Sequence, residues 1–114
     1  MSISEGLKRG TIELVLLSLL SQKDMYGYEI CQQFKELSHD SYVVTEGSLY
    51  PVLYRLIEKG CISDRREKVG KRRTRVYYHI EKAGIDYLDE IKREYFSMHN
   101  GILLILGEKN EKDG

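Results

Sequence analysis

Two neighbouring stretches carry the residue types that could contact a polyanion. Between Arg65 and Arg75, seven residues are basic and only Glu67 is acidic. Just before them, a predicted helix at residues 46–60 turns small, aromatic and charged side chains outward: Gly47, Ser48, Pro51, Tyr54, Arg55 and Glu58, with Tyr50 on the flank. A guanidinium can bind guanine through two hydrogen bonds, and Lys and Arg neutralise phosphates. The combination favours insertion into a nucleic-acid groove, and the alternative is an ordinary solvated helix face.

The helix at residues 46–60 is predicted from its apolar spacing. Its apolar residues fall at i, i+3, i+4, i+7 and i+8, the pattern of a helix with one buried stripe: Leu49, Val52, Leu53, Leu56 and Ile57. Gly60 stands where a C-terminal cap belongs, and Pro51 is tolerated only near a helix start. We therefore expect the first turn to begin close to Thr45 or Ser48.

Two further helices are predicted ahead of it. Thr11 can cap a helix at residues 12–20, in which Leu14 and Leu17 widen the apolar surface beyond one face. A second subunit or the C-terminal helix would cover that extra surface. Asp24 is a candidate cap for a helix at 25–37 that would bury four residues: Tyr26, Ile30, Phe34 and Leu37. With the helix at 46–60, these elements fit a helix-turn-helix.

After Gly60 the apolar period changes from 3.6 to 2, which predicts two strands at residues 61–65 and 75–80. The basic loop at 68–74 would join them into a hairpin. Helices followed by such a hairpin form a winged helix, so we expect a mainly α chain with a β-hairpin, of the α+β class. The candidate DNA contacts of the wing are Lys68, Lys71, Arg72, Arg73 and Arg75.

From Lys82 onward the pattern is helical again. Apolar residues separated by three and four positions form a heptad seam of the kind that packs one helix lengthwise on another: Leu88, Ile91, Tyr95, Met98, Ile102 and Ile105. Dimerisation is favoured over intramolecular packing, with Leu14 and Leu17 as further interface residues, and Asn100-Gly101 is a candidate kink. We expect a winged-helix region at 1–80, a dimerisation helix at 81–107 of the same domain, and a charged tail at 108–114.

Composition limits the classes of protein to consider. The 114 residues suffice for one domain, and 18 basic and 18 acidic residues give no net charge, so only the local clustering argues for a polyanion. Two isolated cysteines indicate a reducing compartment, and the apolar run at 12–20 is too short to cross a membrane, so we expect a cytoplasmic protein. The three histidines and the glycines show no catalytic, metal or cofactor spacing. We therefore expect no enzyme, metal or cofactor.

Several short motifs resemble the PadR family of bacterial winged-helix transcriptional regulators, in its small single-domain branch. They are Arg9-Gly10-Thr11, Tyr26-Gly27-Tyr28-Glu29-Ile30, Glu46-Gly47-Ser48-Leu49-Tyr50-Pro51, Tyr77-Tyr78 and Glu81-Lys82-Ala83-Gly84. The resemblance implies a homodimer, held by the C-terminal helix against the partner's N-terminal helix, that binds palindromic operators in double-stranded DNA and usually represses transcription. In some members a small aromatic or hydrophobic effector releases the DNA.

The motifs thus predict a dimeric, sequence-specific DNA-binding repressor. An effector pocket near Tyr95, Phe96 and Met98 is one hypothesis for the C-terminal helix, and plain interface packing is the other. The alternative function is a winged-helix protein-interaction module without specific DNA readout.

Overall fold

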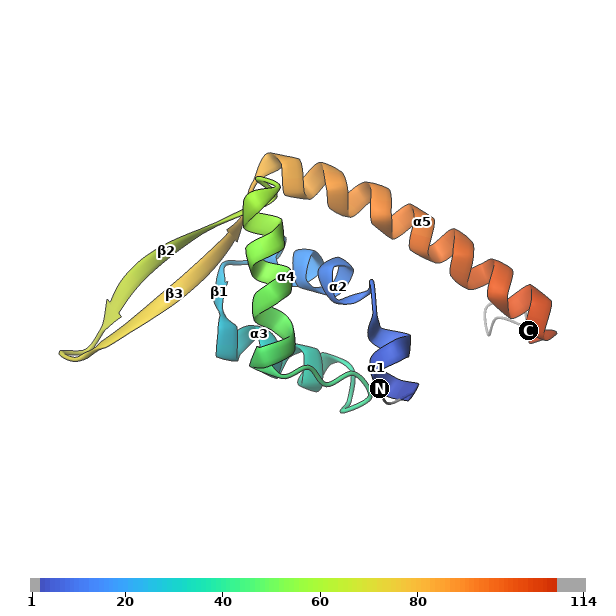
Figure 1. The fold of residues 1–114 in the computed structure, drawn as a ribbon, viewed down its shortest axis with the longest axis horizontal. Coiled ribbons are helices and arrows are strands. Elements are labelled where there is room, and N and C mark those ends of the chain that lie inside the picture. The colour runs from blue at the N-terminus through green and yellow to red at the C-terminus, as the bar shows by residue number, and fades with distance from the viewer. Residues whose placement is uncertain (1–2, 109–114) are drawn as a thin grey trace.

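The computed structural model describes residues 3–108 and confirms the α+β winged helix with a long C-terminal helix (Figure 1). Five helices and three strands follow one another as α1 (Ile3–Lys8), α2 (Ile12–Leu20), β1 (Met25–Tyr26), α3 (Gly27–Leu37), α4 (Glu46–Glu58), β2 (Ile62–Val69), β3 (Arg73–Ile80) and α5 (Lys82–Leu106). The strands form one antiparallel sheet in the order β1-β3-β2. Of the predicted charged tail, residues 109–114 lie outside the described part.

A single apolar core joins α2, α3, α4 and the base of the sheet. The side chains that are completely covered come from all three helices: Leu16, Leu17, Leu20, Ile30, Leu49, Leu53 and Leu56. Tyr78 and Ile80 alternate along β3 and close the core from the sheet side, as expected for a strand with one buried face. Leu37 is 66% exposed, so its predicted burial is wrong, because α3 ends there, beyond the reach of the core.

The wing is longer than the sequence pattern predicts. β2 and β3 contain eight residues each and pair in register from Ile62↔Ile80 to Val69↔Arg73. Only three residues remain for the turn, and Gly70 at its start has φ of +77°, a conformation that glycine adopts without strain. Lys68 and Arg73 therefore belong to strands and not to the predicted loop.

Two short elements were not predicted. β1 is a two-residue strand in which Met25 pairs with Tyr78 and Tyr26 with Tyr77. It displaces the start of α3 to Gly27 and makes Tyr26 the N-cap residue, so the prediction of Asp24 as the cap is wrong. The helix α1 precedes the first helix predicted from the sequence. Thr11 does precede α2, but its hydroxyl bonds to the Lys8 carbonyl and the Tyr42 hydroxyl and caps no α2 amide.

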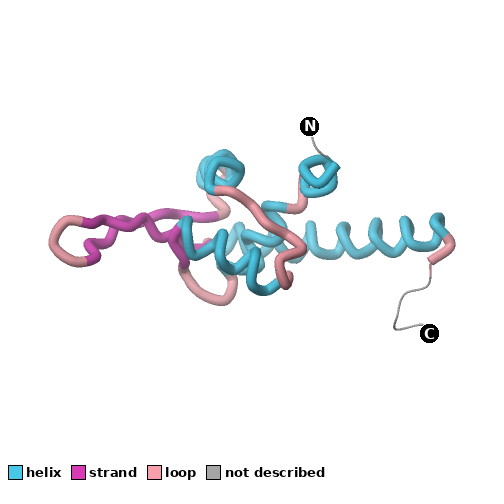
Figure 2. Tube along the Cα trace, turned by 90° about the horizontal axis from the view of Figure 1, so that it is seen from below, coloured by secondary structure: helices cyan, strands magenta, loops and turns pink. Residues whose placement is uncertain are grey.

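The wing and α5 project from opposite ends of the core (Figures 1 and 2). The described chain measures 56 × 28 × 28 Å, and its radius of gyration is 16.0 Å, compared with about 13 Å for a compact chain of this length. α5 runs unbroken through Asn100 and Gly101, where a kink was expected. None of the helices in the described part is both long and apolar enough to cross a membrane.

The junction between wing and α5 is held by close backbone packing. The amide of Glu81 donates to the carbonyl of Cys61 at 2.9 Å. One turn into α5, a Cβ placed on Gly84 would lie 2.1 Å from the same carbonyl oxygen and 2.8 Å from the Ile80 side chain. Only a glycine lets the first turn of α5 rest on this corner.

Changing Gly84 to Ala is expected to destabilise the fold by about 1 to 3 kcal/mol, because backbone must move to admit the methyl group. Gly101→Ala is the matched control, since it lies in the same helix with open space around its Cβ position. That control is expected to stabilise by up to about 1 kcal/mol through helix propensity. Urea unfolding followed by circular dichroism measures both, and equal stability of the two variants would contradict the close packing.

Candidate nucleic-acid interface

The geometry of α4 confirms most of its sequence prediction. Thr45 is the N-cap, and its side-chain oxygen accepts a hydrogen bond from the Ser48 amide at 3.2 Å. Gly60 ends the helix with φ of +74°. Pro51 lies in the second turn and removes the hydrogen bond that would reach the Gly47 carbonyl. Because Gly47 is exposed, that carbonyl is accessible to water.

The outward face of α4 is exposed as predicted. Gly47, Ser48, Pro51 and Tyr54 are exposed, and the predicted stripe is buried except for half-buried Ile57. Tyr50 is half-buried on one flank and stacks on Tyr54, with ring centroids 6.1 Å apart. A stacked pair of tyrosines, one half-buried and one exposed, thus follows the small residues of the first turn.

Arg55 lies on the opposite flank, toward α2 and α5. Its Nη2 is 4.0 Å from Oε2 of Glu13, and the other Glu13 oxygen accepts a 2.5 Å hydrogen bond from Tyr87. That hydrogen bond, together with burial, raises the pKa of Tyr87 to about 12. The Arg55 side chain is still 53% exposed, so it combines a contact to a core helix with access to solvent.

The basic residues of the two wing strands lie on opposite faces of the sheet. Lys68 and Arg66 pair across the ladder with Thr74 and Val76, and these four residues share the face whose base carries buried Tyr78. Five wing residues are exposed and make no ion pair with any described residue: Arg66, Lys68, Lys71, Arg72 and Arg73. Arg66 was missed as a candidate, although its two-residue spacing from Lys68 is visible in the sequence.

Arg75 and Arg65 occupy the other face and are engaged within the chain. The Arg75 guanidinium lies 4.2 Å from the centre of the Tyr26 ring, and Arg65 lies 5.2 Å from that of Tyr77. Arg65 also bonds to Asp24 and Glu67. Of the predicted wing contacts, Arg75 is therefore the one whose side chain already stacks on another residue of the chain.

Asp24 ties the wing to β1. Its carboxylate bonds to Arg65 and lies 2.7 Å from Nδ1 of His79. Partial burial would raise the pKa of Asp24, but the hydrogen bonds with His79 and Arg65 outweigh burial and lower that pKa. Asp24 thus stabilises the base of the wing.

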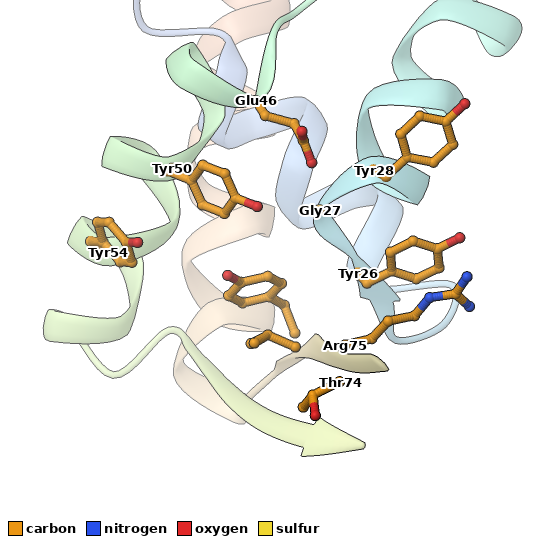
Figure 3. A pocket seen from close by; sticks show the side chains of 10 residues that line it. Tyr26, Gly27, Tyr28, Glu46, Tyr50, Tyr54, Thr74 and Arg75 are labelled. Carbon is orange, nitrogen blue, oxygen red and sulfur yellow. The ribbon is translucent and has the colours of Figure 1, made fainter. Parts of the chain in front are cut away.

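A pocket of about 390 Å³ lies where α4 adjoins the wing (Figure 3). We call it the wing pocket, and its lining residues are Tyr26, Gly27, Tyr28, Glu46, Tyr50, Tyr54, Thr74, Arg75, Val76 and Tyr78. On the other flank of α4, Lys8 donates a 2.5 Å hydrogen bond to the Val43 carbonyl and lies beside Ser48 in a second hollow. Lys8 was not recognised from the sequence, because it belongs to the segment before α2.

The predicted seam of α5 changes from buried to exposed along its length. Leu88 is 8% exposed, Ile91 and Tyr95 are half-buried, and Met98, Ile102 and Ile105 are exposed. Leu17 is fully covered within one chain, so the expectation that it faces a partner is wrong, and Leu88 belongs to the same core. Leu14 remains half-buried at a pocket of about 270 Å³ that Ile91, Tyr95 and Met98 also line.

No metal centre is formed by the residues described. Among them, no group of three or more His, Cys, Asp or Glu side chains is placed to hold a metal ion. His79 faces Asp24, and His99 stacks on Tyr95 with ring centroids 5.7 Å apart.

Comparison with known proteins identifies relatives in sequence and in fold. A family model described as the Transcriptional regulator PadR-like family matches residues 16–90. Over 85 residues the chain is 31% identical to the Transcriptional regulator YqjI of Escherichia coli K12, and this match covers 75% of the chain and 39% of that protein. A transcriptional regulator from Clostridium thermocellum is similar in structure, with a TM-score of 0.80, 31% identity, and coverage of 85% and 94% of the two chains.

The fold also matches Bacillus subtilis PadR, whose structure was solved in complex with operator DNA. The TM-score is 0.67 at 24% identity, and the match covers 72% of this chain and 45% of that one.

Asp24→Asn is expected to lower the stability by about 1 kcal/mol at neutral pH, because it removes a charged partner of Arg65 and His79. The pKa of Asp24 is lower in the folded protein than in the unfolded chain, where it is about 3.9. The ionised carboxylate therefore stabilises the fold at pH values above about 3.9, and this stabilisation is lost as the pH falls and Asp24 is protonated. The difference between variant and wild type should therefore shrink toward pH ~3. Thermal unfolding at both pH values measures it.

Asp86→Asn is the control, because Asp86 makes a single exposed ion pair with Lys82. If it destabilises the protein as much as Asp24→Asn does, Asp24 has no special role at the wing.

Proposed function

Because the chain belongs to the PadR-like family of transcriptional regulators, we propose that it binds duplex DNA of defined sequence as a homodimer and represses transcription. The observation that carries the proposal is the adjacency of two surfaces: the exposed N-terminal half of α4 and the unpaired cations of the wing. A winged helix that binds DNA uses both surfaces: the helix contacts base edges in the major groove, and the wing contacts phosphates.

The residues divide into two roles. Gly47, Ser48, Pro51, Tyr54 and the flanking Tyr50 present small and hydroxyl-bearing groups that suit close approach, phosphates and thymine methyl groups. Arg55 is the one cation within α4, and half of its side chain is exposed. The contact with Glu13 holds the Arg55 side chain toward α2. To reach a base, that side chain would have to turn away from α2.

The wing supplies the second role. Arg66, Lys68, Lys71, Arg72 and Arg73 carry five positive charges on one hairpin in a chain with no net charge. Such a cluster supports phosphate contact, which gives affinity and register rather than sequence information. Arg75 is a less suitable contact, since it stacks on Tyr26. The Bacillus subtilis relative crystallised with operator DNA supports the same use of the fold.

The exposed seam of α5 supports the homodimer. Met98, Ile102 and Ile105 are exposed and continue the heptad spacing toward the C-terminal end of α5. Two copies would present two copies of α4 to a palindromic operator, with half-sites about 10 base pairs or a multiple of that apart. If the chain were a monomer, the same apolar surface would favour the protein-interaction module.

A small aromatic or hydrophobic effector is part of the proposal. The pocket of about 270 Å³ between α2 and α5 is lined by Tyr95, Met98, Leu14 and Ile91, next to the exposed seam. A ligand there would change how α5 lies on α2, and hence how two α4 helices are spaced.

Changing Lys71, Arg72 and Arg73 together to Ala is expected to weaken binding to DNA from upstream of its own operon. Each lost phosphate contact should flatten the slope of log affinity against log salt by about one unit. Fluorescence anisotropy at several salt concentrations measures the affinity and the slope.

The matched control removes three cations from α5, by changing Lys82, Lys92 and Arg93 to Ala. It should leave the slope unchanged. If both triple variants alter the slope equally, the wing is not a specific phosphate contact.

Ile105→Glu is expected to weaken the dimer by about tenfold or more, because it places a charge where an apolar side chain would be buried. DNA affinity should fall with it, since one subunit reads only a half-site. Ser97→Glu on another side of α5 is the control and should remain dimeric. Analytical ultracentrifugation distinguishes the two, and an unaltered Ile105→Glu dimer would refute the seam as the interface.

A further inference from the structure

The wing pocket has walls made largely of tyrosine. Five of its lining residues are tyrosines, and they come from β1, α3, α4 and β3: Tyr26, Tyr28, Tyr50, Tyr54 and Tyr78. Figure 3 shows Tyr50 and Glu46 extending from α4 toward Gly27 at the start of α3. A volume of about 390 Å³ falls within the usual range for small-molecule sites.

Tyr78 is a largely buried residue that lines this pocket. The residue is only 4% exposed, and its hydroxyl makes no hydrogen bond to any residue within 3–108. Burial raises the pKa of Tyr78 to about 12, so the hydroxyl keeps its proton and remains a donor. Within the described residues, every buried side-chain oxygen or nitrogen has a hydrogen-bond partner, so this unpartnered hydroxyl must be in contact with solvent. The pocket therefore offers a donor that an acceptor on a ligand could satisfy.

Glu46 gives the pocket its charge preference. It is the one acidic residue among the lining residues, in the first turn of α4. A carboxylate at this position opposes a phosphate and favours a cation, while the faces of tyrosine rings also attract cations. The protein already uses such a contact at the edge of the pocket, where the Arg75 guanidinium lies over Tyr26 at 4.2 Å.

Gly27 keeps the pocket open between α3 and α4. A Cβ at this position would lie 3.1 Å from the Tyr50 hydroxyl oxygen and 3.5 Å from Oε1 of Glu46. An added methyl group would thus press on the two side chains that form this wall.

We propose that the wing pocket binds a small organic cation, with the charged group beside Glu46, its alkyl or aromatic part against the tyrosine rings, and an acceptor on the Tyr78 hydroxyl. The ligand would then lie between α4 and the wing and compete with DNA for both. Only this second step rests on the proposed function. Ligand binding itself can be measured without DNA.

The test uses two probes of nearly the same shape. Acetylcholine carries a trimethylammonium group and an ester carbonyl that accepts a hydrogen bond, and 3,3-dimethylbutyl acetate has carbon in place of the nitrogen. Titration calorimetry on the full chain at low salt is expected to give about tenfold tighter binding of the cation. Equal affinity for the two esters would overturn the proposal.

Three variants locate the site. Glu46→Gln should remove the preference for the cation, Tyr78→Phe should weaken both esters equally, and Gly27→Ala should weaken both by narrowing the pocket. Glu94→Gln makes the same change as Glu46→Gln in the pocket between α2 and α5, and should have no effect. If Glu94→Gln weakens binding and Glu46→Gln does not, the cation binds elsewhere and the proposal is wrong.

DNA competition is measured separately by anisotropy, with equal ionic strength in every sample. Acetylcholine should lower the DNA affinity of the wild type, while the neutral ester at the same concentration should lower it less. Cation binding by a chain that binds no DNA would refute the proposed function and leave the site standing. DNA binding that is insensitive to a bound cation would refute the competition.

Discussion

The pairing of β3 with β1 and β2 determines which side chains face the core and which face solvent along the sheet. Tyr77 faces Tyr26 across the ladder and Tyr78 faces Met25, so one step of register fixes which tyrosine closes the core. The same register continues into the wing and places Arg66 and Lys68 on the side of Val76, while Arg65 and Arg75 face the other way. A slip by one residue would exchange these faces and bury the wrong side chains.

Glu13 of α2 connects α4 with α5. Its carboxylate accepts a hydrogen bond from the Tyr87 hydroxyl of α5 and lies near Arg55 of α4, so α5 and α4 meet at one side chain of α2. Lys59 covers the Tyr87 ring at 5.3 Å and adds a second link between the same helices. The angle between α4 and α5 is therefore set inside one subunit, before any partner is bound.

Sequence patterns predicted α4 well because three independent signals agree there: an apolar stripe, the Thr45 cap and the Gly60 stop. They missed β1, because two residues contain no period and form a strand only through β3. Asp24 was predicted to be a helix cap because a carboxylate just before a helix usually has that role. In the structure, the Asp24 carboxylate instead contacts His79, which is distant in sequence. The interface residues, the DNA contacts and the effector pocket remain predictions, since each depends on a molecule other than this chain.

The outer half of the wing stands away from the apolar core, and β2 is an edge strand with one row of backbone groups unpaired by the sheet. Such an edge can recruit a strand from another chain and begin aggregation. Here the edge strand carries five consecutive charged residues, Asp64 to Lys68, of both signs. The charges of β2 would thus also keep concentrated protein in solution by discouraging edge-to-edge pairing, whether or not DNA is present.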